Sequence, residues 1–204
     1  MKKEIWMVTV LVLVATVSAA VLGFVNVTTR PIIQANQARK LRESVLKSAK
    51  VNYTDENLEE KFKSEFESKT IDGRDVYFRY DDSGELSSIS FRLTGSGFQG
   101  QIEGIISFKP DLETVVGLEI LSQQETPGLG ARITEDWFLD QFDGKKVRPE
   151  LRIVQGGAEG ENEVDGITGA TRTSKAVQEI VNDEVDQMKN QVLTGEVMEG
   201  LGNE

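Results

Sequence analysis

The sequence contains no cysteine and no histidine among its 204 residues. Without cysteine it has no disulfide, no thiolate nucleophile, no cysteine-ligated zinc and no conventional iron–sulfur cluster. Without histidine it lacks the commonest general base and metal ligand, which excludes a Ser-His-Asp triad and a histidine-ligated haem. Carboxylate chemistry and hard-metal binding stay open. Any redox function must therefore come from a bound organic cofactor.

Positive charge is also scarce. The chain has 23 Lys and Arg against 34 Asp and Glu, which gives a net charge of −11. A field of that sign repels nucleic-acid phosphates, so we expect no nucleic-acid partner. The simplest role of the acidity is to keep the soluble part of the chain in solution. The hydrophobic share of 38% is sufficient for a packed core, so disorder is not expected.

Charge is absent altogether between residues 5 and 29, which are predominantly apolar. A helix that crosses a bilayer takes about 20 residues, so residues 1–29 are predicted to be an N-terminal transmembrane anchor. A cleavable signal peptide is the competing interpretation, because Ser18-Ala19-Ala20 offers small residues at a cleavage site. The apolar run continues past them, which favours an uncleaved anchor. Residues 30–50 are predicted to form a juxtamembrane helical stalk.

The soluble part, residues 51–195, is expected to be one α+β domain. Alternating hydrophobicity and turn signals predict strands at 75–80, 86–93, 102–108, 114–121 and 147–155. Helices are predicted at 52–69 and 135–142 and from Thr171 onward, with a glycine-rich connection at 94–100 and a mobile tail at 196–204. Closely spaced strands favour an antiparallel meander. The expected fold is an antiparallel twisted sheet with flanking helices, preceded by one N-terminal transmembrane helix.

The first motif with chemical content is DGITGAT, from Asp165 to Thr171. It is a glycine-bearing turn that delivers hydroxyls to the start of a predicted helix, where free N–H groups and the positive end of the helix dipole favour a phosphate. Gly169 and Ala170 are small enough for a bulky group to approach. Read alone, the segment is more typical of a plain helix N-cap.

The second motif is ETPGLG, from Glu125 to Gly130. Proline followed by glycine predicts a tight turn, and by itself only a strand-exit loop. Leu129 is the one large apolar side chain on this loop. It either packs into the core or covers a ligand.

Both motifs resemble signatures of one family, the FMN-binding domain family that includes RnfG and NqrC. DGITGAT fills every specified position of the family's flavinylation motif, and ETPGLG matches the family's loop that lies against the flavin. The resemblance extends over nearly the whole chain, with the anchor, the stalk and the glycine-rich segment before a strand in the same order. The short chain is more similar to RnfG than to NqrC.

The resemblance implies a function. It predicts an electron-relay subunit of a membrane-bound, ion-translocating ferredoxin:NAD oxidoreductase complex, which catalyses no complete reaction on its own. FMN would be linked through its phosphate to Thr171 by an FMN transferase. The cofactor-binding residues expected on this basis are Asp165, Thr168, Gly169, Ala170, Thr171, Glu125, Thr126, Gly128 and Leu129. No catalytic residue and no metal ligand is assigned.

The charge count and the resemblance predict opposite sides of the membrane for the soluble domain. Lys2 and Lys3 precede the anchor, whereas Arg30, Arg39, Lys40 and Arg42 follow it. The charge count alone favours a cytoplasmic domain. The resemblance implies an extracytoplasmic domain on the cell's inner (plasma) membrane, and we give it precedence, because two lysines on a very short tail are easily retained inside.

Some interpretations remain open at this stage. A free-standing, membrane-anchored extracytoplasmic flavoprotein would donate electrons to another acceptor, and a cofactor-free interaction domain would use Thr171 only as a cap. The acidic run at 159–165 is expected to be a solvated loop, because it lacks the EF-hand pattern of a calcium site. Trp137 and Phe138 are expected to be core residues, with stacking on a flavin as the alternative.

Overall fold

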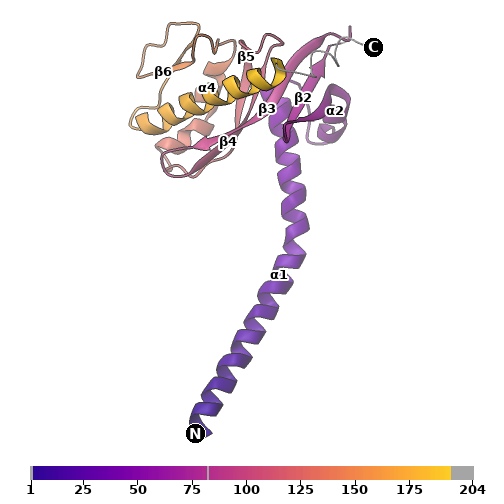
Figure 1. Ribbon diagram of the computed structural model, residues 1–204, viewed down its shortest axis with the longest axis vertical. Coiled ribbons are helices and arrows are strands. Elements are labelled where there is room, and N and C mark those ends of the chain that lie inside the picture. Colours follow the sequence, from indigo (N-terminus) through magenta and orange to yellow (C-terminus); the bar gives the residue numbers. More distant parts are fainter. Residues whose placement is uncertain (1, 82, 194–204) are drawn as a thin grey trace. The chain divides into compact units, whose positions relative to one another are not determined.

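The computed structural model describes residues 2–81 and 83–193 and divides the chain into two units, Met1–Lys40 and Leu41–Glu204 (Figure 1). The predicted mobile tail, 196–204, lies outside the described residues. The two units are described separately below.

The first unit consists of the N-terminal part of α1 (Lys2–Ser48). Its apolar side chains are exposed; Leu22 and Phe24, for example, are 70% and 72% exposed. This helix is long and apolar enough to cross a membrane. The predicted anchor and stalk form one continuous helix, with Pro31 inside it. Proline lacks an N–H and removes one intrahelical hydrogen bond there.

The second unit is built on a five-stranded antiparallel sheet in the order β1-β2-β3-β4-β5. The strands are β1 (Phe66–Ile71), β2 (Arg74–Tyr80), β3 (Leu86–Ser96), β4 (Gln101–Phe108) and β5 (Val115–Ser122). Each pairs with its neighbour in sequence, which is the predicted meander. The predicted α+β class is therefore confirmed.

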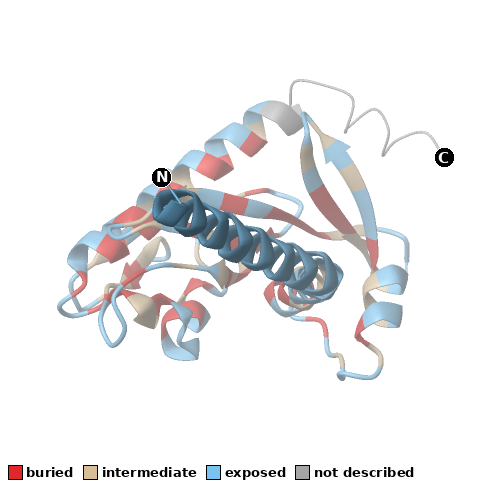
Figure 2. Cartoon of the chain, turned by 90° about the horizontal axis from the view of Figure 1, so that it is seen from below, coloured by how far each residue is buried: buried red, intermediate tan, exposed pale blue. Residues whose placement is uncertain are grey.

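Two hydrophobic clusters cover the two faces of this sheet. Successive side chains of a strand point to opposite faces, and in β2 the side chains of Val76 and Phe78 join one cluster while that of Tyr77 joins the other. The larger cluster is closed by α4 (Thr171–Leu193), whose buried positions repeat along one side of the helix (Figure 2). The smaller cluster contains Val45 and Leu46 at the end of α1.

The helix predicted from Thr171 onward is α4, and its predicted apolar face is confirmed. All five residues of that face are buried: Val177, Ile180, Val181, Val185 and Met188. Beneath it, β3 continues to Ser96, so the prediction of a connection from residue 94 is wrong. Gly95 pairs with Ile102 of β4, and it is a glycine at a close approach to α4, because a Cβ there would collide with the Ile180 side chain. A glycine in a strand can mark such a close approach rather than its end.

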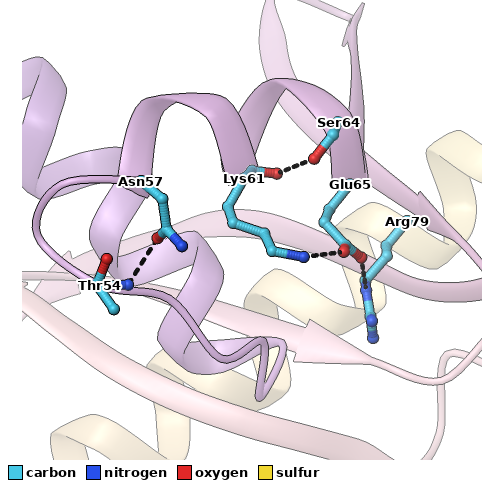
Figure 3. Close-up of polar contacts among 6 residues, drawn as sticks. All are labelled: Thr54, Asn57, Lys61, Ser64, Glu65 and Arg79. Carbon is cyan, nitrogen blue, oxygen red and sulfur yellow. Dashed lines mark hydrogen bonds and ion pairs between the residues drawn. The ribbon is translucent and has the colours of Figure 1, made fainter.

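The helix predicted at 52–69 is shorter in the structure. It comprises α2 (Leu58–Glu65), and the chain then enters β1. Phe66 stacks on Phe62 with ring centroids 5.6 Å apart, but its backbone pairs with β2, so the four-residue spacing of the aromatics does not extend the helix. Glu65 joins the two elements, since it accepts hydrogen bonds from Lys61 within α2 and from Arg79 on β2 (Figure 3).

The segment between β5 and α4 consists of short elements. They are η1 (Gly130–Thr134), α3 (Asp136–Leu139), η2 (Asp140–Phe142), β6 (Arg152–Val154) and β7 (Glu163–Asp165), the last two paired in parallel. The strand predicted at 147–155 is reduced to β6. Asn182 of α4 explains why, because its side chain hydrogen-bonds both the N–H and the C=O of Leu151 in place of a strand partner.

Candidate functional site

The start of α4 forms one wall of a cavity of about 330 Å³. Three segments that are distant in sequence line it: the β3–β4 loop, the loop after β5, and the first turn of α4. The lining residues are Phe98, Glu125, Thr126, Leu129, Gly130, Gly169, Ala170, Thr171, Arg172 and Thr173. Six of the nine predicted cofactor-binding residues therefore line a single cavity.

The turn before α4 fixes where the helix begins. Gly169 has a φ of +82°, a left-handed conformation that glycine adopts without strain. The N–H of Ala170 then donates to the carbonyl of Ile167, and Ser174 reaches back, its hydroxyl donating to the carbonyl of Ala170 and accepting from the N–H of Ile167. The Ser174 hydroxyl thus stabilises the start of α4 through these two hydrogen bonds.

Thr171 is left free by this arrangement. It is the first residue of α4 and is exposed, and among the described residues its hydroxyl has no hydrogen-bond partner. An N-cap threonine precedes the helix and binds an N–H of its first turn. Thr171 is the first residue of the helix, and its hydroxyl makes no such capping bond to a described residue. Its hydroxyl is available for chemistry beside N–H groups that lack intrahelical partners.

The loop after β5 has the predicted tight turn. Pro127 and Gly128 occupy its central positions, with a φ of +74° at Gly128, the pattern of a type II turn. The carbonyl of Thr126 accepts from the N–H groups of Leu129 and Ala131, both at 3.1 Å. Gly128 shapes this turn and does not line the cavity.

Leu129 projects from this turn into the cavity. Its side chain is 45% exposed and belongs to neither hydrophobic cluster, so it is not a core residue. A Cβ at Gly169 would lie 3.4 Å from Leu129 Cδ2, which places the leucine beside the turn that leads to Thr171.

One part of the cavity lining, Phe98 with Arg172, was not anticipated from the sequence. Phe98, 50% exposed, lies under the guanidinium of Arg172, whose Cζ is 4.9 Å from the ring centroid. The pair places a flat apolar surface and a positive charge beside Thr171. The only signal in the sequence was Arg172 following the motif directly. Phe98 lies in the glycine-rich segment at 94–100, which the resemblance included but which was not assigned to the site.

Asp165 and Thr168 line a second cavity, of about 610 Å³, together with Arg132, Trp137, Gln155, Gly156 and Gly166. Asp165 accepts a hydrogen bond from the N–H of Ala158 at 2.9 Å. Trp137 is 42% exposed on this cavity, whereas Phe138 is fully buried, so the core prediction is confirmed for Phe138 alone. The indole N–H of Trp137 donates to Glu135, which together with Arg132 lowers the pKa of that carboxyl.

Comparison with known proteins connects this site to a family. The FMN-binding domain family matches residues 97–186, which contain both cavities. The RnfG subunit of an ion-translocating oxidoreductase complex from Methanosarcina acetivorans is 31% identical over 196 residues, which cover 93% of this chain and 97% of that protein.

Two further proteins are similar over different shares of their length. The RnfG subunit of the Na(+)-translocating ferredoxin:NAD(+) oxidoreductase complex from Acetobacterium woodii is 41% identical over 96 residues, which cover 47% of this chain and 45% of that protein. This match therefore spans less than half of the Acetobacterium protein. The crystal structure of Shewanella oneidensis NqrC has the same fold, with a TM-score of 0.71 at 23% identity over 79% of this chain and all of that one.

Proposed function

The chain belongs to the family of RnfG subunits of ion-translocating oxidoreductase complexes, and on this premise we propose that it is the FMN-bearing electron-relay subunit of such a complex. One observation supports the proposal most strongly: at the start of α4, within the FMN-binding domain, Thr171 lines a cavity, and no described residue hydrogen-bonds its hydroxyl. FMN, when bound, supplies the redox chemistry that this chain, without cysteine or histidine, cannot supply itself.

The residues around the cavity fit such a group. A phosphate at Thr171 would meet the free N–H groups and the positive dipole end of α4, with the Arg172 charge next to it. Leu129 and Phe98 supply apolar surface for a ring system. A cavity of about 330 Å³ is at the lower end of the range for small-molecule sites. Such a small site leaves part of the cofactor accessible to redox partners.

We further propose that the linkage is a phosphoester between FMN and the Thr171 hydroxyl, formed by an FMN transferase. Thr168, Gly169 and Ala170 form the turn that presents Thr171, and Asp165 organises the chain before it. The test is the visible spectrum of the denatured, desalted protein. Wild type should stay yellow and Thr171→Val colourless at an unchanged melting temperature. Yellow denatured Thr171→Val protein would contradict the assignment.

The complex that we propose transfers electrons from ferredoxin to NAD and couples this transfer to ion translocation, with this chain as one relay. Its partners would be the other membrane subunits, so several polytopic proteins should co-purify with it from native membranes. Purification of the flavin-loaded chain alone would favour the free-standing flavoprotein instead.

The α1 anchor, residues 1–29, is proposed to cross the membrane once, followed by the stalk at 30–50 and the FMN-binding domain at 51–195 outside the cytoplasm. Protease added to right-side-out spheroplasts should digest the domain. Digestion only in inverted vesicles would reverse this topology and agree with the charge count.

A further inference from the structure

Glu125 is a buried carboxylate in an otherwise exposed loop. It is 5% exposed, while its neighbours Gln124 and Thr126 are exposed. A carboxylate is rarely buried to this extent without specific partners, because the charged group loses its hydration. Its partners therefore indicate its role.

Both carboxylate oxygens accept a hydrogen bond, and each bond reaches a different segment. Oε2 accepts from the hydroxyl of Thr173, in the first turn of α4, at 2.6 Å. Oε1 accepts from the backbone N–H of Gln99, in the β3–β4 loop, at 2.9 Å. Both donors are neutral. One side chain thus connects all three segments that line the cavity of Thr171.

At two positions beside this carboxylate, the structure has room only for glycine. A Cβ at Gly97 or at Gly130 would come closer than 3.0 Å to the carboxylate atoms of Glu125. At Gly130 it would also meet the hydroxyl of Thr173. Two glycines, one on each loop, therefore permit both loops to close around the same carboxylate.

We propose that Glu125 is a positioning residue: through Thr173 it fixes the first turn of α4, and with it the Thr171 hydroxyl, against the loop that carries Leu129. Residues two apart on a helix do not face each other, so the bond to Thr173 holds the helix without occupying Thr171. The inference rests on the proposed function insofar as Thr171 is the attachment residue. It refines the earlier assignment of Glu125 as a cofactor contact.

Four variants of the full-length chain in detergent test this role. Glu125→Ala and Thr173→Val remove the hydrogen bond between residues 125 and 173, whereas Glu125→Gln and Thr173→Ser keep a hydrogen bond there. In Glu125→Gln, the side-chain carbonyl can accept from the N–H of Gln99, and the side-chain NH2 can donate to the Thr173 hydroxyl. The rate of covalent FMN incorporation by the transferase should fall roughly tenfold in the first pair, the equivalent of one hydrogen bond to a charged group. The second pair should stay within about twofold of wild type.

A second measurement needs no flavin. The N–H of Gln99 donates to Glu125, and the N–H of Ser174 donates to the carbonyl of Ala170 at the start of α4. In the chain made without the transferase, Glu125→Ala should therefore speed amide hydrogen exchange at Gln99 and Ser174. Exchange of the β4 amides should stay unchanged. Glu125→Gln should exchange as wild type does.

The outcomes separate the possibilities. Incorporation and exchange at wild-type levels in Glu125→Ala would overturn the inference, as would faster exchange throughout the sheet, which indicates a purely structural loss. Slow incorporation in Glu125→Gln at unchanged exchange would also overturn it, because the charge would then act directly. If wild type accepts no FMN, the proposed function fails, and the exchange data alone decide whether Glu125 fixes the helix start.

Discussion

Replacement of Leu129 by alanine separates a ligand-covering side chain from a core side chain. A fully buried leucine truncated to alanine costs about 2–5 kcal/mol in the free energy of unfolding, because transfer and cavity terms add. Leu129 is 45% exposed and outside both hydrophobic clusters. Full burial of a leucine side chain stabilises the fold by about 1.5–3 kcal/mol. Leu129 is only about half buried and its truncation leaves no internal cavity, so Leu129→Ala should lower the free energy of unfolding by about 1 kcal/mol.

The control is Leu93→Ala. Leu93 is 1% exposed within the larger cluster, so the same chemical change should cost about 2–5 kcal/mol there. Both variants would be made as the full-length chain without the FMN transferase and unfolded by urea in detergent. Tryptophan fluorescence follows the transition, and linear extrapolation gives the free energy of unfolding.

The flavin-loaded chain supplies the second half of the test. If Leu129 covers the ring system, Leu129→Ala should change the absorption spectrum or the reduction potential of the flavin, because the ring exchanges apolar contact for water. A loss as large as that of Leu93→Ala in the flavin-free chain, with an unchanged potential in the loaded chain, would refute this account of the loop.

Three further perturbations follow from the structure. Asp165→Asn should reduce FMN incorporation with a small change in melting temperature, because an amide oxygen still accepts the one backbone N–H bond; full incorporation would leave only a structural role. Gly95→Val should destabilise the domain by about 1–3 kcal/mol in urea unfolding, because its side chain collides with Ile180, and an unchanged stability would contradict that packing. The pKa of Glu65 is lowered by its hydrogen bond from Arg79, so the carboxylate stabilises the fold above its unfolded pKa and loses this effect as the pH falls through the lowered pKa. The melting temperature of Glu65→Gln should therefore be lower than that of wild type at neutral pH and equal to it at low pH. A difference in melting temperature that does not depend on pH would refute the ion pair.

The central strands and α4 could be predicted from the sequence because each has a strong local pattern. β2 to β5 alternate or are continuously apolar between turn signals, and one side of α4 is apolar. β1 could not be found in this way. Its sequence, FESKTI, is largely polar and becomes a strand through pairing with β2. Tertiary pairing overrides a weak local preference there.

The candidate site was predicted only where a motif carries it. DGITGAT and ETPGLG indicated the start of α4 and the facing loop, and the structure brings Thr171 and Leu129 to one cavity. The linking role of Glu125 depends on hydrogen bonds with Gln99 and Thr173, which lie 26 and 48 residues away. Phe98 likewise meets Arg172 from a distant segment. Spacing within one sequence does not reveal such contacts.

The covalent flavin on Thr171 is tested most directly by the intact mass of the chain, expressed with and without the FMN transferase. The account predicts that the transferase adds the mass of one FMN less one water, that fragmentation assigns the increment to Thr171, and that Thr171→Val never acquires it. An unchanged mass of wild type in the presence of an active transferase would contradict the central claim, as would the same increment on Thr171→Val.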